Sequence, residues 1–425
     1  MTKWLVLALF ALTYILLLIF PKRRAIVALA AALILIAAGV IPVNKIFYTI
    51  NWNVLMMIAG TMGLVSLFIE SKMPALLGDL IISKSPDVKW AILLLSLLAG
   101  LISAFVDNVA TVLMIAPIVM TVSKKLDISP VPGIIAISIS SNLQGAATLV
   151  GDTTSILLSG QAGLDFFDFF FFQGKAGMFW VVQISAIAAS LVLLFNLRKQ
   201  NKKIAMEERS AVTDYFPTVL LLGTIVLLIL ASFIPAGSKP EVTNGLICMT
   251  LFIFGLARKF IETRRAETIK KALKDIDIAT LVLLAGLFIV VGSLTEAGVV
   301  DEISRAFVSI SNDNVFLLYS LLVWASVLLS AFIDNIPYVA AMLPVTAGIA
   351  AQMGISPNLL YFGLLTGATL GGNLTPIGAS ANIAALGILR KEGHEVATPA
   401  FMKISVPFTL TAVIVGYFLV WFIWR

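Results

Sequence analysis

Long apolar runs separated by short polar loops constrain this chain more than any other feature. The first, LVLALFALTYILLLIF at positions 5–20, is followed by PKRR and then by a second run. A run of about 18–20 apolar residues is long enough to cross a bilayer as a helix. Only 12% of the 425 residues are charged and 60% are hydrophobic, whereas about a quarter of a soluble domain is charged. We therefore expect an all-α polytopic membrane protein.

The charged and metal-ligating residues exclude several other classes. The net charge of +6 comes from Lys and Arg in loops, which is typical of a membrane surface rather than of nucleic-acid binding. The single cysteine, Cys248, and the single histidine, His394 in the loop RKEGHEV, exclude disulfides and thiolate metal sites. We expect no metal, no cofactor and no nucleic-acid partner. The first apolar run lacks a small-residue cleavage site, so we expect a retained helix rather than a signal peptide.

Three kinds of segment follow from the positions of the apolar runs and their interruptions. Segments that are apolar on both sides of an Asp-Asn pair are too long for one crossing and predict re-entrant helical hairpins. Segments interrupted by GAATLVGDTTS or GATLGGNLTPIGAS predict broken helices. The predicted spans are 4–20, 25–42, 54–69, 177–196, 216–234, 244–257, 278–294 and 403–424, the hairpins 90–121 and 315–351, and the broken helices 132–158 and 359–389.

The distribution of Lys and Arg predicts the orientation of these segments. If the loop PKRR is cytoplasmic and each hairpin returns to its own side, the cytoplasmic loops contain 23 of the 29 basic residues. This asymmetry is expected from the positive-inside rule. The arrangement has ten spans and both termini outside. The six basic residues left outside are Lys3, Lys45, Lys175, Lys239, Arg305 and Arg425.

The chain contains an internal duplication. INWNVLMMIAG (50–60) matches IDIATLVLLAG (276–286) at a shift of 226, and SAFVDNV matches SAFIDNI at a shift of 227. A third block, TLVGDTT (148–154), matches TLGGNLT (369–375) at a shift of 221. The topology above makes the two copies inverted, an architecture of secondary transporters. We expect an inverted repeat of five spans plus one hairpin each, residues 1–197 and 216–425, joined by a cytoplasmic linker at 198–215.

The two Asp-Asn pairs are the first candidate site. They place Asp107, Asn108, Asp334 and Asn335 at membrane depth, where a carboxylate costs about 2.5–3.5 kcal/mol on insertion scales. Two symmetry-related carboxylates predict a central polar site that binds protons or cations, with the amides beside them. The alternative is that each Asp caps the helix that follows it. The two roles are compatible.

The interrupted segments are the second candidate site. Unwound backbone and its polar side chains would coordinate a small polar solute, although glycine-mediated helix packing is the alternative. Asn142 and Gln144 line this site or hydrogen-bond between helices. The other candidate residues are Thr111, Thr148, Gly151, Asp152, Thr153, Thr154, Thr369, Gly372, Asn373 and Thr375.

These motifs carry a family resemblance. SAFVDNVATVLMIAPI, TLVGDTTS followed by GLDFFDF, SAFIDNIPYVAAMLPV and GGNLTPIGASANI resemble the ion transporter superfamily. The chain is most similar to the branch of the ArsB arsenite/antimonite permeases and the melanosomal P protein, with NhaD sodium/proton antiporters nearby. Relatives that transport divalent anions carry Ser-Asn-Thr at the hairpin tips. The Asp-Asn pairs add negative charge there, which disfavours dicarboxylates.

The function expected from the residues and the resemblance together is proton-coupled efflux of arsenite or antimonite across the plasma membrane. The alternative is a sodium/proton antiporter, and transport of an organic or inorganic anion is a third option. An intramembrane aspartyl protease and a channel are hypotheses from other classes, but we expect no enzyme. The expected partners are a small inorganic solute, protons or sodium, and lipid. An energising ATPase or a second copy is left open.

Overall fold

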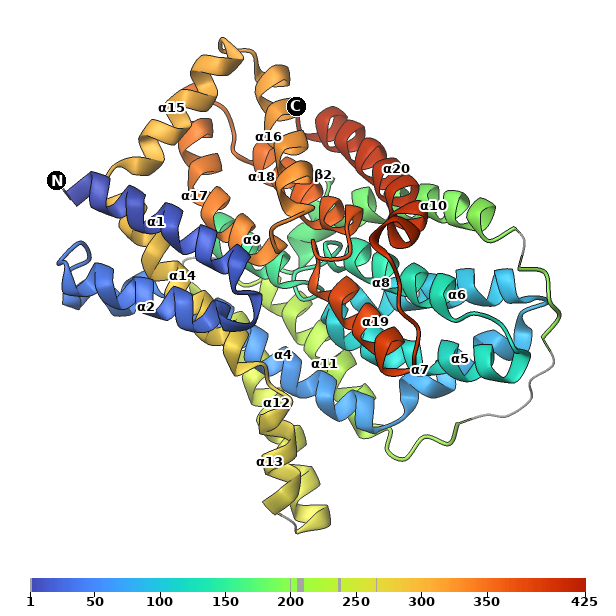
Figure 1. The fold of residues 1–425 in the computed structure, drawn as a ribbon. Coiled ribbons are helices and arrows are strands. Elements are labelled where there is room, and N and C mark those ends of the chain that lie inside the picture. Colours follow the sequence, from blue (N-terminus) through green and yellow to red (C-terminus); the bar gives the residue numbers. More distant parts are fainter. Residues whose placement is uncertain (1, 199, 205–209, 236–237, 265) are drawn as a thin grey trace.

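The computed structural model describes residues 2–198, 200–204, 210–235, 238–264 and 266–425, and its regular structure is almost entirely helical (Figure 1). The predicted linker 198–215 falls partly outside the described residues, as do the loop cations Lys199, Arg209 and Arg265. The prediction of a helical membrane protein is confirmed. A two-stranded antiparallel ribbon, β1 (Phe171–Phe172) and β2 (Lys175–Ala176), is a small addition that we did not predict.

The helices fall into two sets in chain order. The first set comprises α1 (Thr2–Ile19), α2 (Arg24–Ala37), α3 (Ile46–Thr49), α4 (Trp52–Glu70), α5 (Met73–Lys84), α6 (Val88–Ser103), α7 (Asn108–Leu126), α8 (Val131–Gly145), α9 (Thr153–Ala162) and α10 (Met178–Asn196). The second comprises α11 (Phe216–Ser232), α12 (Thr243–Thr263), α13 (Ala266–Lys274), α14 (Ile278–Glu296), α15 (Val299–Ser311), α16 (Val315–Ser330), α17 (Asn335–Met353), α18 (Asn358–Leu365), α19 (Ser380–Lys391) and α20 (Thr398–Trp424).

Within the described residues, seven helices are long and apolar enough to cross a membrane. They are α4, α7, α10, α12, α14, α17 and α20. Two further pairs, α1 with α2 and α15 with α16, pass the same test together and bend by 114° and 118° between their members. Helices α6 and α11 are apolar but shorter. The chain is therefore a multi-pass membrane protein.

The order and spacing of the helices repeat along the chain. Helices that begin at Val88, Asn108, Val131 and Thr153 are followed 227 residues later by helices that begin at Val315, Asn335, Asn358 and Ser380. Short breaks separate α6 from α7 and α16 from α17; each break ends at the Asp of the expected Asp-Asn pair, and the Asn is the first residue of the next helix. Interruptions also separate α8 from α9 and α18 from α19, the latter holding a π-helical turn at Thr366–Leu370 and a 3-10 turn at Gly372–Leu374. The opposite orientation of the two copies in the membrane stays a prediction.

Side-chain caps start equivalent helices in both copies. Asn51 accepts a hydrogen bond from the backbone N–H of Val54, and Asp277 accepts one from that of Thr280. Asp87 and Asn314 begin α6 and α16 in the same way. An acceptor at this position satisfies an N–H group that has no partner inside the helix. In a bilayer, where no water replaces such a bond, the caps determine where each helix begins.

Glycines allow the closest helix contacts, and these contacts also come in equivalent pairs. Helix α12 packs on α4, and α2 packs on α14. A Cβ on Gly60 would lie 2.5 Å from the backbone carbon of Cys248, and one on Gly286 would lie 2.7 Å from that of Ala28. Only a residue without a side chain fits between backbones this close. The two contacts tie each copy to the other.

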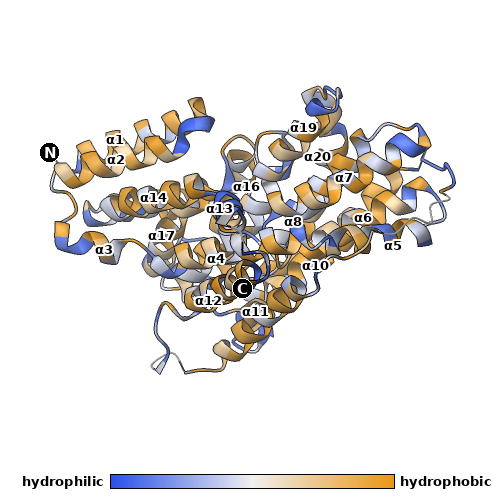
Figure 2. Cartoon of the chain, turned by 90° about the horizontal axis from the view of Figure 1, so that it is seen from below, coloured by the Kyte–Doolittle hydropathy of each residue, from blue (hydrophilic) through white to orange (hydrophobic). Residues whose placement is uncertain are grey.

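The interior of the molecule is built from the broken helices, and apolar side chains cover its outside. Every residue of α8 from Gly133 to Gly145 is buried, and so is all of α18. Helices α1, α2, α10 and α11 instead expose large apolar side chains, such as Trp4, Leu33 and Leu191. Figure 2 shows hydrophobic residues along most helices, with hydrophilic residues gathered at loops and helix ends. This distribution suits a protein surrounded by lipid.

Replacing Gly286 by Ala tests the close packing of α2 on α14. We expect this variant to lower the free energy of unfolding by about 1–3 kcal/mol, because the new methyl group meets backbone atoms that cannot rotate away. Gly223→Ala is the matched control, since a Cβ there has nothing within 4 Å. Thermal unfolding of the detergent-purified variants measures the difference. Equal unfolding midpoints would contradict the packing described.

Candidate functional site

A cavity of about 430 Å³ lies where the two copies meet. It is bounded by both Asp-Asn tips, by the break between α8 and α9, and by parts of α4, α13 and α14. The polar residues that line it are Ser66, Glu70, Asp107, Asn108, Asp152, Thr153, Lys271, Asp275, Asp277, Thr280, Asn335 and Ser380. The cavity brings together residues more than 300 positions apart in the chain.

Asp107 serves as a helix cap and also faces the cavity. Its Oδ1 accepts hydrogen bonds from the backbone N–H groups of Val109, at 3.0 Å, and Ala110, at 3.1 Å. Its Oδ2 accepts none from the described residues and is available to a bound solute. The capping alternative and the binding prediction are therefore compatible in geometry. The backbone carbonyl of Asp107 also accepts a hydrogen bond from the hydroxyl of Thr111. Thr111, another predicted site residue, therefore stabilises the backbone of the tip.

Asp152 is the second carboxylate in the cavity, at the start of α9. Its Oδ2 accepts the Thr154 hydroxyl at 2.7 Å and the side-chain amide of Asn335 at 3.4 Å. The Thr154 hydroxyl lies 2.9 Å from that of Thr369. Asp152 thus joins the broken helix of the first copy to the hairpin tip and the broken helix of the second. A solute bound here would touch both copies at once.

Asn108 connects the first tip to the interior. Its side-chain amide donates to Asn142 Oδ1 at 3.0 Å, and the Asn142 amide donates to the Thr369 backbone carbonyl at 2.8 Å. Asn142 therefore hydrogen-bonds between helices and is not among the residues that line the cavity. Asn108 keeps contact with the cavity itself.

Asp334 is in a different environment from Asp107. Its Oδ1 accepts the backbone N–H of Ile336 at 3.1 Å. Its Oδ2 accepts an N–H of the Arg24 guanidinium at 2.7 Å and the Ser380 hydroxyl at 2.8 Å. The Asp334 side chain is only 3% exposed and does not line the cavity.

Several predicted site residues hold the backbone instead of facing the cavity. The hydroxyls of Thr148 and Thr375 donate to the backbone carbonyls of Ala104 and Ala331, just before each tip. The Asn373 amide donates to the carbonyl of Ile139. Gly151 has no room for a Cβ, which would lie 2.6 Å from the carbonyl oxygen of Gly145, and Gly372 is packed against Gly378. These residues support the site without lining it.

The same contacts correct the register of the third repeat block. A shift of 221 matched Thr148 to Thr369, but Thr148 and Thr375 make equivalent hydrogen bonds, and the shift between them is 227. TLVGDTTS therefore corresponds to TPIGASAN, so Asp152 is equivalent to Ala379 and Asn142 to Thr369. The earlier match failed because two similar Gly- and Thr-rich strings lie six residues apart.

With a shift of 227, Thr153 corresponds to Ser380, so the sequence could have predicted Ser380 as a site residue. Ser380 lines the cavity. Arg24 was counted only as a loop cation, because no local pattern links PKRR to a residue 310 positions away. The acidic residues Glu70, Asp275 and Asp277 were also missed. They lie at helix ends in polar loops, where sequence alone gives no signal for a cavity.

The cavity opens at the end of the molecule that carries the basic loops. Asp275, Asp277 and Lys271 are exposed there. Glu70 pairs with Lys271 at 2.5 Å and with Lys259, and Ser66 donates to Asp275 at 2.5 Å. The positive-inside prediction places these loops in the cytoplasm.

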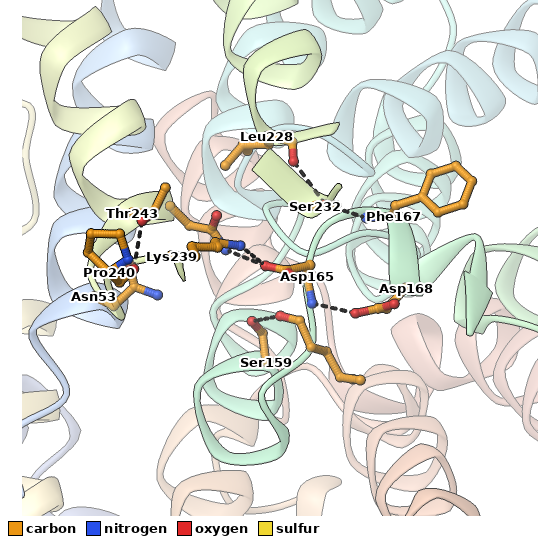
Figure 3. Close-up of polar contacts among 12 residues, drawn as sticks. Asn53, Ser159, Asp165, Phe167, Asp168, Leu228, Ser232, Lys239, Pro240 and Thr243 are labelled. Carbon is orange, nitrogen blue, oxygen red and sulfur yellow. Dashed lines mark hydrogen bonds and ion pairs between the residues drawn. The ribbon is translucent and has the colours of Figure 1, made fainter. Parts of the chain in front are cut away.

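A network of loop contacts lies at the other end of α12, where that helix begins (Figure 3). Lys239 forms an ion pair with Asp165, which also accepts from Asn244 at 3.4 Å. Asp168 accepts the backbone N–H of Asp165 at 2.7 Å, and burial raises the pKa of the Asp168 carboxyl above its ordinary value. Among the basic loops, by contrast, the hydrogen bond from Lys124 lowers the pKa of the Glu392 carboxyl below its ordinary value. We call the Asp165–Lys239–Asn244 group the outer network.

Metal-ligating side chains do not gather in the part of the chain that the structure describes. No group of three or more His, Cys, Asp or Glu residues could hold a metal ion there. Cys248 is buried between α12 and α4.

A family model described as "Citrate transporter" matches residues 14–367. The chain belongs to the citrate transporter family. An uncharacterized transporter of Mycobacterium tuberculosis is 31% identical over 406 residues, which are 93% of this chain and 92% of that protein. The human P protein is 24% identical over 449 residues, covering 86% of this chain and 53% of its own.

A solved structure extends this family assignment to the fold. The YdaH transporter of Alcanivorax borkumensis has a TM-score of 0.61 and 15% identity, with 89% of this chain and 86% of that chain covered. The family model and the relatives make the protein a membrane transporter of the citrate transporter family, and the solved structure shows that it shares the fold of YdaH. The similarity to the P protein agrees with the resemblance drawn from the motifs, and the closer placement beside ArsB and NhaD stays a prediction.

Cysteine labelling tests the position of the cavity. In a Cys248→Ser background, we expect Thr153→Cys to react with a small charged methanethiosulfonate and Thr148→Cys to stay unreacted. Thr153 lines the cavity, whereas the Thr148 side chain is fully buried against Ala104. Inside-out vesicles should label faster than right-side-out vesicles, because the cavity opens toward the basic loops. Equal labelling of the two threonine positions would count against this cavity.

Proposed function

We propose that the chain is a secondary active transporter of the plasma membrane that exports arsenite or antimonite in exchange for protons. The observation that carries this proposal is the pair of cavity carboxylates, Asp107 and Asp152. Among the described residues, no Lys or Arg lies within ion-pair distance of either. Both can therefore take up a proton or contact a solute without displacing an internal cation.

The charge of the cavity limits the class of substrate. Among the described lining residues, five are acidic and Lys271 alone is basic, and Lys271 is itself paired with Glu70. A negative cavity attracts cations and admits neutral solutes, and it repels a free tricarboxylate such as citrate. The family description therefore does not by itself decide the substrate. Arsenite, an uncharged trihydroxy species at neutral pH, fits this charge.

The polar groups suit a small hydroxylated solute. The free Oδ2 of Asp107 would accept a hydroxyl hydrogen, and the hydroxyl of Thr153 would donate to one of the solute's oxygens. The Ser380 hydroxyl already donates to Asp334 Oδ2, so it would accept a hydrogen bond from the solute. Thiolate chelation is excluded, since the single cysteine lies away from the cavity. Uptake of a proton by Asp107 or Asp152 would change the cavity's charge by one. The affinity of the cavity for the solute would then depend on whether the carboxyl group is protonated. Coupled transport requires such a dependence between proton binding and solute binding.

The same carboxylates support a second candidate, a sodium/proton antiporter. Asp107, Asp152 and Thr153 offer oxygen atoms to one cavity, and hard cations prefer oxygen ligands. A proton and a sodium ion would then compete for one group of carboxylates. The two candidates differ in the transported species and share the coupling residues.

Asn substitutions test the coupling role. We expect Asp107→Asn and Asp152→Asn to reduce transport at least about tenfold at equal membrane expression, because each removes a proton-binding group and keeps the side-chain shape. Asp127→Asn is the matched control: Asp127 is exposed at the end of α7 in the left-handed region, which Asn tolerates. The measurement is accumulation of arsenite in cells without their own exporter, against an empty vector.

The remaining outcomes separate the candidates. Lower arsenite in cells with the parent, abolished by collapse of the proton gradient, supports the proposal. If arsenite and antimonite are unaffected but sodium causes proton movement in inside-out vesicles, the antiporter replaces it. Uptake of citrate by the same vesicles would overturn the charge argument. Cys248→Ser should transport normally, and loss of transport in that variant would contradict the exclusion of thiolate binding.

A further inference from the structure

The two Asp-Asn tips are equivalent in sequence and backbone, but only one of the two aspartates has a cation of the protein beside it. Both aspartates cap the helix that follows with Oδ1. Asp107 lines the cavity and its Oδ2 accepts no hydrogen bond from the described residues, whereas Asp334 Oδ2 accepts hydrogen bonds from Arg24, at 2.7 Å, and from Ser380. One carboxylate of the duplicated pair is thus open, and the other is occupied by a cation of the protein.

The packing of the helices explains why only one tip has a cation. Arg24 is the first residue of α2, which packs on α14 where Ala28 meets Gly286. In the equivalent contact Cys248 of α12 meets Gly60 of α4, so Ala28 corresponds to Cys248. Four residues earlier, Arg24 corresponds to Asn244. Asn244 is neutral and donates to Asp165 in the outer network, away from Asp107.

We propose that Arg24 is a tethered counter-ion that removes Asp334 from ion and proton exchange, so that exchange takes place at the first copy's carboxylates, Asp107 and Asp152. An arginine keeps its charge at every pH a cell meets, so Asp334 cannot lose this partner by titration. The Asp334 side chain is 3% exposed and that of Arg24 20%, so solvent screens the pair weakly. This inference rests on the proposed function for its transport readout only.

A carbodiimide experiment tests the inference without any substrate. Hydrophobic carbodiimides react with protonated carboxyl groups, and peptide mass spectrometry locates the product. We expect Asp334 to stay unmodified in the purified parent and to become modified in Arg24→Gln, while Asp107 reacts in both. Arg23→Gln is the matched control, since Arg23 is an exposed cation of the same loop. Modification of Asp334 in the parent as readily as Asp107 would overturn the proposal.

Paired substitutions test the same point in transport. Removing one member of a buried ion pair leaves an uncompensated charge, and removing both does not. We expect Arg24→Gln and Asp334→Asn each to reduce transport at least about tenfold, and the double variant to return to within about threefold of the parent. Arg24→Gln combined with Asp107→Asn should stay inactive. Parent-like transport by Arg24→Gln alone, or no recovery in the Arg24–Asp334 double variant, would contradict a counter-ion role.

Thermal unfolding in detergent separates misfolding from loss of exchange. The Arg24→Gln and Asp334→Asn midpoints should both fall and should recover together in the double variant, whereas Asp107→Asn should give no recovery with Arg24→Gln. If the parent transports neither arsenite nor sodium, the proposed function fails. The carbodiimide and unfolding results still decide the role of Arg24, because neither needs a substrate. Independent, additive midpoint losses for Arg24 and Asp334 would overturn the pairing.

Discussion

A carboxylate placed at the start of a buried helix is the interaction on which the site depends. The free N–H groups at the start of α7 and α17 need acceptors, and Asp107 and Asp334 supply them with one oxygen each. A serine would satisfy the same N–H groups, but it would leave no second oxygen and no charge. The cap thus explains why a costly charge is tolerated at this depth, and the second oxygen is what remains for chemistry.

The duplicated scaffold places these caps at equivalent points and then differs at a few positions. Asp107 and Asp334, and Thr148 and Thr375, occupy matching places with matching backbone bonds. Asp152 has Ala379 as its counterpart, and Arg24 has Asn244. Both differences act in the same direction, since they concentrate unpaired negative charge on the first copy's side of the cavity. A symmetric fold therefore supports an asymmetric site.

The two ends of the cavity also differ physically. Exposed acidic side chains and Lys271 surround the end with the basic loops, whereas Lys239 and Asp165 join loops at the other end of α12. Because Lys239 precedes α12 and Asp165 follows α9, this ion pair crosses between the copies. Contacts of this kind must separate if the cavity is to open on the other side.

The sequence by itself determined the helical membrane class, the duplication and the position of the Asp-Asn tips, because these depend on local hydrophobicity and local repetition. Asp107, Asn108, Asp152, Thr153 and Asn335 could be predicted for the same reason: a polar residue in an apolar run stands out. Only the tertiary structure decided that Thr148, Thr375 and Asn373 hold backbone carbonyls, and that Arg24 neutralises Asp334. Such pairings depend on which helices pack together, and residues hundreds of positions apart leave no local signal of that contact.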